Sequence, residues 1–244
     1  FFFLGGTVAA LLLSGHAVAG WPQIRKFYVF LLALLTVATM FRSLAELRLL
    51  VAGWAAAAAC SAVWGLVQFG RGYAAASQSG ADLYHALVGH RITGFMSLWM
   101  TFAGQLMIVL LLVAAYLLFA PASRKEQWLL GLAWCLMAVA LVLALTRGPW
   151  IGLFAGLVYL VWRWKRKLLA ALPVLLLVAL AAAPPAVRDR VASIVRPRSE
   201  LDSNQHRMML WRTGMEMVKA HPWFGLGPEQ VGEQFDRYVP AGFP

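Results

Sequence analysis

The residues best suited to chemistry are arginines at the ends of apolar segments. Arg147 lies in the short turn Thr146–Trp150 between two apolar runs, and Arg91 opens the stretch Arg-Ile-Thr-Gly-Phe directly before another. An arginine at a membrane boundary is costly unless it meets water or an anion. Two outward-facing guanidinium groups at one depth suit a diphosphate, because each forms bidentate bonds to phosphate oxygens. Snorkelling to lipid headgroups is the alternative interpretation of both.

A third arginine, Arg207, lies near the start of a predicted amphipathic helix that begins at about Asn204 and ends before Pro222. One stripe of this helix is apolar and consists of Met208, Trp211, Met215 and Val218. We interpret the helix as lying on a bilayer or on a helical bundle, with the stripe used for packing.

Several kinds of site are not supported by the sequence. The pair Gly225 and Gly227 lacks the third glycine and the preceding strand of a dinucleotide fingerprint, and there is no Walker loop. The histidines lack metal-ligand spacing, and no Asp-x-Asp motif occurs. We therefore expect neither a metal nor a cofactor.

The composition indicates a membrane protein. Of the 244 residues 61% are hydrophobic and 13% charged, and the mean hydropathy is +0.72, which is far from the average of soluble domains. The net charge of +11 points to membrane topology and to anionic lipid or phosphate groups rather than nucleic acid. Cys60 and Cys135 stand in apolar runs and are interpreted as packing residues.

About twenty apolar residues cross the ~30 Å hydrocarbon core as a helix. The sequence therefore predicts an all-α polytopic membrane protein with about seven spans in residues 1–183, followed by a large, mostly helical loop, 184–244. The predicted spans are 1–19, 27–41, 49–69, 95–120, 128–145, 150–162 and 168–183. Because the chain begins inside an apolar run and stops in a Pro/Gly-rich segment, we expect a piece of a longer protein, with the loop truncated.

Charge alone does not settle the orientation. Placing the basic loops 42–48, 121–127 and 163–167 in the cytoplasm puts eight Lys or Arg there, against nine outside when only the first four arginines of the loop 184–244 are counted. We prefer this orientation because four charges in five residues at 163–167 form the strongest local signal. In this orientation Arg25 and Lys26 lie outside, against the positive-inside rule, and we have no physical explanation for their position.

Three pieces in order resemble the O-antigen ligase/polymerase superfamily: RITGF at 91–95, TRGPWIGL at 146–153, and R-x3-W-x10-HPWFGLGPEQV from Arg207 to Val231. The resemblance implies a GT-C-like fold and transfer of a glycan from undecaprenyl diphosphate to an acceptor hydroxyl. It places this reaction on the outer face of the bacterial inner membrane, in lipopolysaccharide or surface polysaccharide biosynthesis.

The resemblance also assigns roles to individual residues. It implies that Arg147 and Arg207 are the catalytic arginines that hold the diphosphate, and that Arg91, Trp150 and Trp211 bind substrate. Guanidinium groups stabilise a leaving diphosphate without a metal. The general base that the acceptor hydroxyl needs is expected to be a histidine beyond Pro244. After RITG the chain continues with Phe95-Met-Ser, which departs from the family pattern at Arg91.

The acceptor stays open at this stage. The protein is expected to partner a lipid-linked glycan donor, an acceptor glycolipid, polysaccharide or protein, and the bilayer. It is therefore a ligase, a polymerase or a protein O-oligosaccharyltransferase of this family. An anionic-lipid transporter or flippase is an alternative of another class, although the arginines at one surface favour transfer over conduction. A non-catalytic membrane scaffold is a third possibility.

The orientation can be tested by cysteine labelling. We expect a cysteine placed at Ser199 to react with a membrane-impermeant maleimide added from the periplasmic side, because the loop 184–244 is predicted to lie there. Labelling from the cytoplasmic side alone would reverse the topology.

Overall fold

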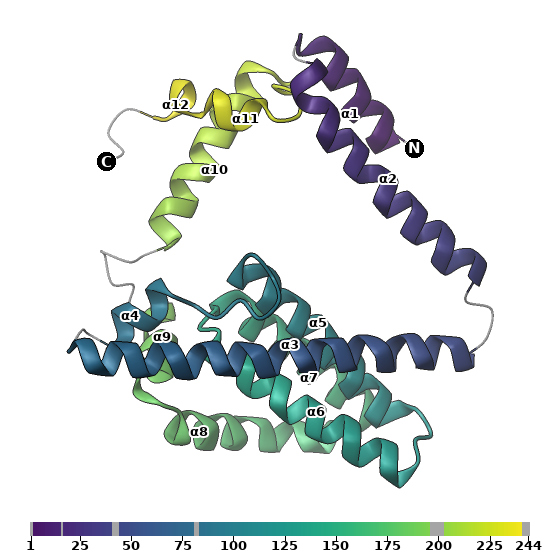
Figure 1. Ribbon diagram of the computed structural model, residues 1–244, viewed down its shortest axis with the longest axis vertical. Coiled ribbons are helices and arrows are strands. Elements are labelled where there is room, and N and C mark those ends of the chain that lie inside the picture. The colour runs from purple at the N-terminus through teal and green to yellow at the C-terminus, as the bar shows by residue number, and fades with distance from the viewer. Residues whose placement is uncertain (1, 16, 41–43, 81–82, 196–202, 241–244) are drawn as a thin grey trace. The chain divides into compact units, whose positions relative to one another are not determined.

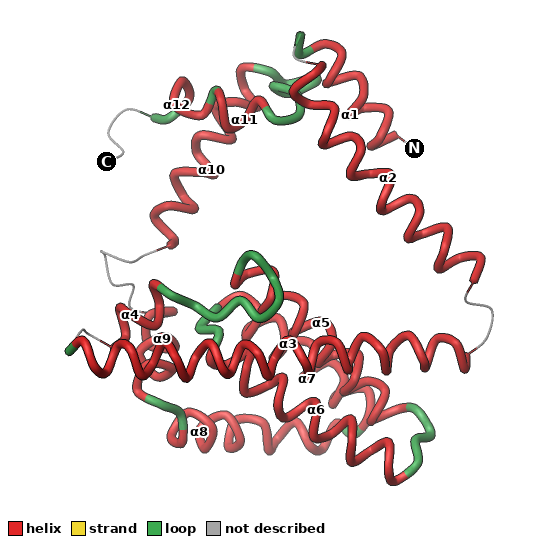
Figure 2. Tube along the Cα trace, in the orientation of Figure 1, coloured by secondary structure: helices red, strands yellow, loops and turns green. Residues whose placement is uncertain are grey.

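The computed structural model describes residues 2–15, 17–40, 44–80, 83–195 and 203–240. Within these ranges every regular element is a helix (Figures 1 and 2). The chain divides into two compact units, residues 45–197 and residues 1–44 with 198–244, which are described separately below. The all-helical class is thus confirmed for the described chain, while the predicted boundary between 183 and 184 stays a prediction, and Ser199 lies outside the described residues.

The larger unit contains seven α-helices and one 3₁₀ helix. They are α3 (Leu44–Ser79), α4 (Leu83–Gly89), α5 (Trp99–Phe119), α6 (Arg124–Leu143), α7 (Arg147–Trp164), η1 (Arg166–Ala171), α8 (Leu172–Ala182) and α9 (Pro185–Val195). The start of α6 is fixed by a capping box: Ser123 Oγ accepts from the Glu126 amide at 3.3 Å, and the Glu126 carboxylate accepts from the Ser123 amide at 2.7 Å.

Helix α5 lies at the centre of the main core. Its buried face includes Phe102, Leu106 and Leu110, and it packs against small residues of α3 and against the second half of α6. In α3 the buried positions recur at helical spacing as Ala55, Ala58 and Ala62. The indole of Trp134 on α6 donates to the Leu110 carbonyl at 3.0 Å. The alanines of α3 complete this core, and the indole bond adds a directional tie between α5 and α6.

Helices α5 and α7 approach each other at glycines. A Cβ atom built on Gly152 would collide with the Met107 side chain, and one built on Gly156 would collide with the side chain of Leu111. A Cβ atom on Gly148 would meet nothing within 4 Å. Gly152 and Gly156, four residues apart, therefore allow α5 and α7 to pack closely, and Gly148 takes no part in this contact.

A second, smaller core lies beneath the junction of α6 and α7. It consists of Tyr84, Leu87 and Val88 of α4, Leu145 of the junction and Val187 of α9. Helix α9 falls in the sequence stretch that we assigned to the loop, yet it packs against α4 and α7. This cluster joins three segments that are far apart in the sequence.

Three described helices are long and apolar enough to cross a membrane: Arg48–Gln78, Trp99–Phe119 and Arg124–Leu143. They correspond to the predicted spans 49–69, 95–120 and 128–145. The total of seven is not shown. The segment predicted to span at 168–183 contains the 11-residue α8, which reaches only about 16 Å at 1.5 Å per residue.

Other sequence boundaries also need correction. The predicted span 1–19 contains α1 (Phe2–Leu13) and then turns at Gly15, where φ is +73°. Residues 20–26, which lie between the predicted spans 1–19 and 27–41, are helical and belong to α2 (Ala17–Met40), which contains Pro22. Apolar runs set the length of a predicted span, but they do not show where a helix continues into polar sequence. Cys60 and Cys135 are exposed, not packed.

The smaller unit contains α1, α2 and the C-terminal helices. The latter are α10 (Ser203–Ala220), α11 (Gln230–Glu233) and α12 (Phe235–Tyr238). Gly227, at φ +90°, packs against Ser14 in the turn after α1, where any Cβ atom would collide. The segment that contains Gly227 and Pro228 therefore packs on α1 and α2. The side chains of Thr213, Met217 and Gln230 are buried.

The glycine contact between α5 and α7 makes a stability prediction. Gly156→Ile should lower the free energy of unfolding in detergent by about 1–3 kcal/mol, because the added atoms overpack the contact with Leu111. Gly131→Ile on α6 is the matched control, since its Cβ atom would meet nothing within 4 Å. Thermal unfolding of the two purified variants measures the difference. Equal stability of the two would contradict the contact.

Candidate active site

The Thr-Arg-Gly segment is the junction between two helices. Helix α6 ends at Leu143 and α7 begins at Arg147, with Thr146 as its N-cap residue. Leu145 has φ +50°, a left-handed conformation that costs a non-glycine residue of order 1–3 kcal/mol. This residue lets the chain change direction within three residues, and it stands two positions before Arg147.

The surroundings of Leu145 hold it in this conformation. Its side chain is 1% exposed and belongs to the small core. Its amide donates to the Val142 carbonyl at 3.2 Å, and its carbonyl accepts from Nε of Arg190 at 3.0 Å. Thr146 Oγ1 donates to the Ala144 carbonyl at 2.9 Å. Strained residues persist where contacts over-determine them and cluster at functional sites, which marks this junction as a candidate site.

Arg147 is the first residue of α7 and is half-buried. The first amides of a helix have no partner within the helix, and the helix dipole is positive at this end. Gly148, next to Arg147, is exposed, so the backbone at this end of α7 reaches the surface. The guanidinium and the N-terminal end of the helix are thus both positive, which favours binding of an anion at this position.

Trp150 has a structural contact. Its indole Nε1 donates to the Leu141 carbonyl at 2.9 Å, and its half-buried ring packs against both cores of the unit. The bond ties the first turn of α7 to the end of α6. The substrate contact predicted for Trp150 stays a prediction, and it would have to use a part of the ring other than the N–H.

Arg91 is positioned by two contacts. Its Nε donates to the Val88 carbonyl at 3.0 Å, and its guanidinium lies 5.2 Å from the centre of the Trp99 ring. Val88 and Leu145 belong to the same small core. The segments that carry Arg91 and Arg147 therefore pack around one cluster, as the diphosphate hypothesis requires, although their common use of a ligand stays a prediction.

The Arg-Ile-Thr-Gly-Phe loop is fastened to α3 by Gln68. The amide oxygen of Gln68 accepts from the backbone amides of Thr93 and Gly94, both at 3.0 Å, and its Nε2 donates to the Gly94 carbonyl at 3.3 Å. Ser61 Oγ accepts from the Phe95 amide at 3.0 Å. Gly94 has φ +58°, and a Cβ atom there would collide with Phe102. The glycine of this motif is thus explained by its tight contact with α3 and α5.

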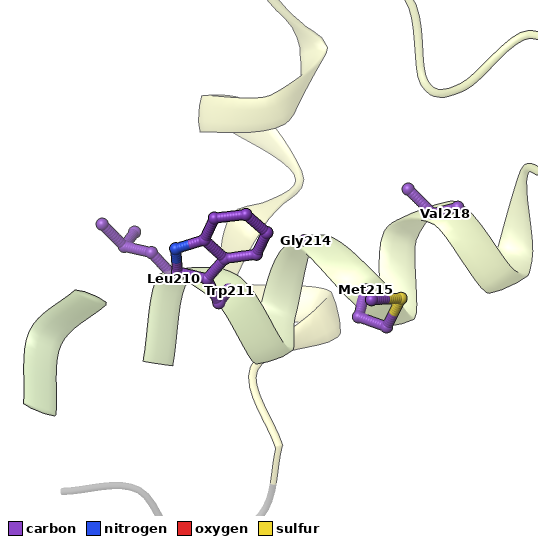
Figure 3. Close-up of a pocket in the computed structure, with 5 residues that line it drawn as sticks. All are labelled: Leu210, Trp211, Gly214, Met215 and Val218. Atoms are coloured by element: carbon purple, nitrogen blue, oxygen red, sulfur yellow. The ribbon is translucent and has the colours of Figure 1, made fainter. Parts of the chain in front are cut away.

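Arg207 and Trp211 belong to the other unit, on α10. Arg207 is exposed, and Trp211 is 75% exposed. Figure 3 shows a surface pocket on α10 lined by Leu210, Trp211, Gly214, Met215 and Val218. The predicted helix is confirmed, but its apolar stripe is not used for packing within its unit. Thr213 and Met217, on another face of α10, are the buried positions.

Sequence reasoning missed the residues that support the site. Arg190, Tyr84, Gln68 and Ser61 make the contacts described above, and Arg190 is only 3% exposed. A weak signal for Arg190 was present: it lies three residues after Val187 and one before Val191, on the apolar side of its helix. Nothing in the sequence distinguished Gln68 from other polar residues in long helices.

The structure also describes residues that bear on metals and proton transfer. Among the described residues, no group of three or more His, Cys, Asp and Glu side chains is placed to hold a metal ion. His221 Nε2 lies 3.1 Å from the Tyr238 hydroxyl, and the two rings meet edge to face. This contact gives His221 a structural part after α10, and we assign it no part in proton transfer.

The Gln68 contacts can be tested by hydrogen exchange. Gln68→Met should speed amide exchange in a peptide that covers Thr93 and Gly94, because both amides lose their acceptor. Gln68→Glu keeps the acceptor oxygens and should retain most of the protection. Mass spectrometry of the two variants measures this, and equal exchange in both would show that Gln68 does not hold the loop.

Comparison with known proteins supports the sequence resemblance for part of the chain. No curated protein and no solved structure matches the chain. Residues 130–244, which contain the Thr-Arg-Gly junction and α9 to α12, match the family described as O-Antigen ligase, whose members are glycosyltransferase-type enzymes. Residues 130–244 are therefore similar to the O-antigen ligase domain.

Proposed function

We propose that this protein is a membrane glycosyltransferase of the O-antigen ligase type. It transfers a glycan from undecaprenyl diphosphate to an acceptor hydroxyl on the outer face of the bacterial inner membrane. The observation that carries the proposal is the family match over a region that begins in α6 and includes the strained junction and Arg147. Three helices able to cross a membrane fit a lipid-linked donor.

The chemistry of this reaction explains why arginines are needed. The acceptor oxygen forms a bond to the anomeric carbon of the glycan, while the bond from that carbon to the diphosphate oxygen breaks. The electron pair of the broken bond goes to the diphosphate, and the hydroxyl proton goes to a general base. Guanidinium groups already in place stabilise the growing negative charge on the leaving diphosphate and remain protonated throughout.

Arg147 is the first residue that we assign to this task. It stands at the positive end of α7, and the left-handed Leu145 two positions earlier gives the junction a defined backbone path. Arg91 is assigned a supporting part in the same unit, because its guanidinium is held by Val88 and Trp99 near the same small core. Arg207, in the other unit, is assigned to the donor from the family resemblance alone.

The aromatic residues have different parts in this proposal. Trp211 presents an exposed indole beside an apolar pocket on α10, and such a surface suits stacking on a sugar face or contact with a lipid chain. Trp150 supports the junction through Leu141. Ligation is the proposed activity, and polymerisation of the glycan and protein O-glycosylation are the alternatives of the same family.

The arginine assignment can be tested in the whole protein. Arg147→Ala and Arg207→Ala should each lower glycan transfer in membrane vesicles by about 10²-fold or more, the effect of losing one transition-state donor. The amount of each variant in the membrane should stay at the wild-type level, because neither residue is part of a buried core. Transfer of a labelled glycan and immunodetection of the protein measure the two quantities.

Matched controls are available on the same or a neighbouring helix. Arg212→Ala removes another exposed arginine of α10, and Arg188→Ala removes an exposed arginine of α9; both variants should retain transfer. Wild-type transfer by Arg147→Ala and Arg207→Ala would refute the diphosphate role. An equal loss in all four variants would show that the total positive charge matters instead.

A further inference from the structure

Arg190 is a buried arginine that the proposed chemistry does not use. It is only 3% exposed, and it is the one charged side chain among the buried residues of the described chain. Burying a guanidinium requires compensating hydrogen bonds, because removing its charge from water is expensive. The hydrogen-bond partners of Arg190 therefore show what holds the buried charge.

The guanidinium of Arg190 bridges two other segments. Its Nε donates to the Leu145 carbonyl at 3.0 Å, and its Nη1 lies 3.4 Å from the Tyr84 hydroxyl. Tyr84 belongs to α4, Leu145 to the α6–α7 junction and Arg190 to α9. A guanidinium is long and planar and has several donors, so it can reach both partners from one position. The side chain therefore connects three elements at one point.

The hydrogen bond to the Leu145 carbonyl matters most, because Leu145 is the residue of the junction with a strained backbone. Leu145 is left-handed, and its carbonyl direction determines how the chain enters Thr146 and Arg147. A hydrogen bond to this carbonyl favours the one backbone conformation in which the oxygen points at Arg190. Arg190 is too deeply buried to serve as a surface ligand, so its influence on a bound anion passes through the backbone of the junction.

We propose that Arg190 is a positioning residue that fixes the Thr-Arg-Gly junction and thereby the direction of Arg147. The inference rests on the proposed function for its effect on catalysis, but its effect on the junction is independent of that function. It extends the site to α9, and it assigns a part to a residue that touches neither donor nor acceptor. The side chain of Tyr84 is the secondary anchor that keeps the guanidinium in place.

The chain offers a close control in Arg188. It lies on α9 two residues away, and its Nε also donates to a backbone carbonyl, that of Ala183 at 2.8 Å, but it is exposed and its partner belongs to the turn between α8 and α9. Arg188→Gln and Arg190→Gln therefore remove the same charge and the same type of bond. Only the second variant releases the junction at Leu145.

The first measurement reports the junction itself. A spin label on Gly148→Cys fits there, because Gly148 is exposed and a Cβ atom would meet nothing within 4 Å. Cys60 and Cys135 are replaced by alanine so that only this site is labelled. Electron paramagnetic resonance should show a new mobile component in Arg190→Gln and an unchanged spectrum in Arg188→Gln. An unchanged spectrum in both would overturn the inference, whatever the transfer activity.

The second measurement reports catalysis in the whole protein without the label. Arg190→Gln should lower kcat/KM for the lipid diphosphate donor by about 10²-fold, the cost of misplacing a catalytic group by about 1 Å. The KM for the acceptor should stay unchanged. Arg190→Lys keeps a cationic donor and should recover part of the loss, while Tyr84→Phe should lower kcat/KM less than Arg190→Gln. A purely structural role would instead change the amount of folded protein and leave its kinetic constants unchanged.

The outcomes separate this inference from the proposed function. If Arg147→Ala retains transfer, the diphosphate role fails, and the spin label alone still decides whether Arg190 fixes the junction. If Arg147→Ala is inactive while Arg190→Gln has a mobile label and full activity, the positioning role is overturned and the proposed function stands. If Arg190→Gln does not accumulate in the membrane, Arg190→Lys and Tyr84→Phe carry both measurements, and wild-type behaviour of both would count against the inference.

Discussion

The hydrogen bond from Arg190 to the carbonyl of Leu145 is the interaction on which the candidate site depends. It joins a helix of the C-terminal half to the junction between α6 and α7, and the second donor of the same guanidinium reaches α4 through Tyr84. A charged group buried at this point would destabilise the fold without these partners. With them, it holds a strained backbone that an apolar core alone would leave free to relax.

The same principle applies at the Arg-Ile-Thr-Gly-Phe loop. In this loop the backbone approaches α3 and α5 closely, and only glycine fits at position 94. The Gln68 side chain accepts a hydrogen bond from the Gly94 amide and donates one to the Gly94 carbonyl. In both places a polar side chain from a distant segment satisfies backbone groups that have no helical partner. Irregular backbone beside apolar helices is stable only when it is matched in this way.

Features that depend on a local sequence pattern could be predicted from the sequence. The helix at 204–220 has a clear period, and the structure places α10 within one residue of its predicted start. The arginines at 91 and 147 were found because they interrupt apolar runs. Residues 20–26 lie between the predicted spans 1–19 and 27–41, yet α2 runs through them. Pro22 stands inside α2, where a proline removes one helical hydrogen bond and costs about 3 kcal/mol, and α2 continues through it nonetheless.

The sequence by itself determined that this protein is helical, apolar and basic, and its motifs pointed to the O-antigen ligase family that the match over 130–244 confirms. These properties follow from composition, period and short motifs, which are all local along the chain. Only the tertiary structure decided which polar residues are partners. Arg190 and Leu145 are 45 positions apart, and no local pattern encodes a bond between a side chain and a distant backbone carbonyl.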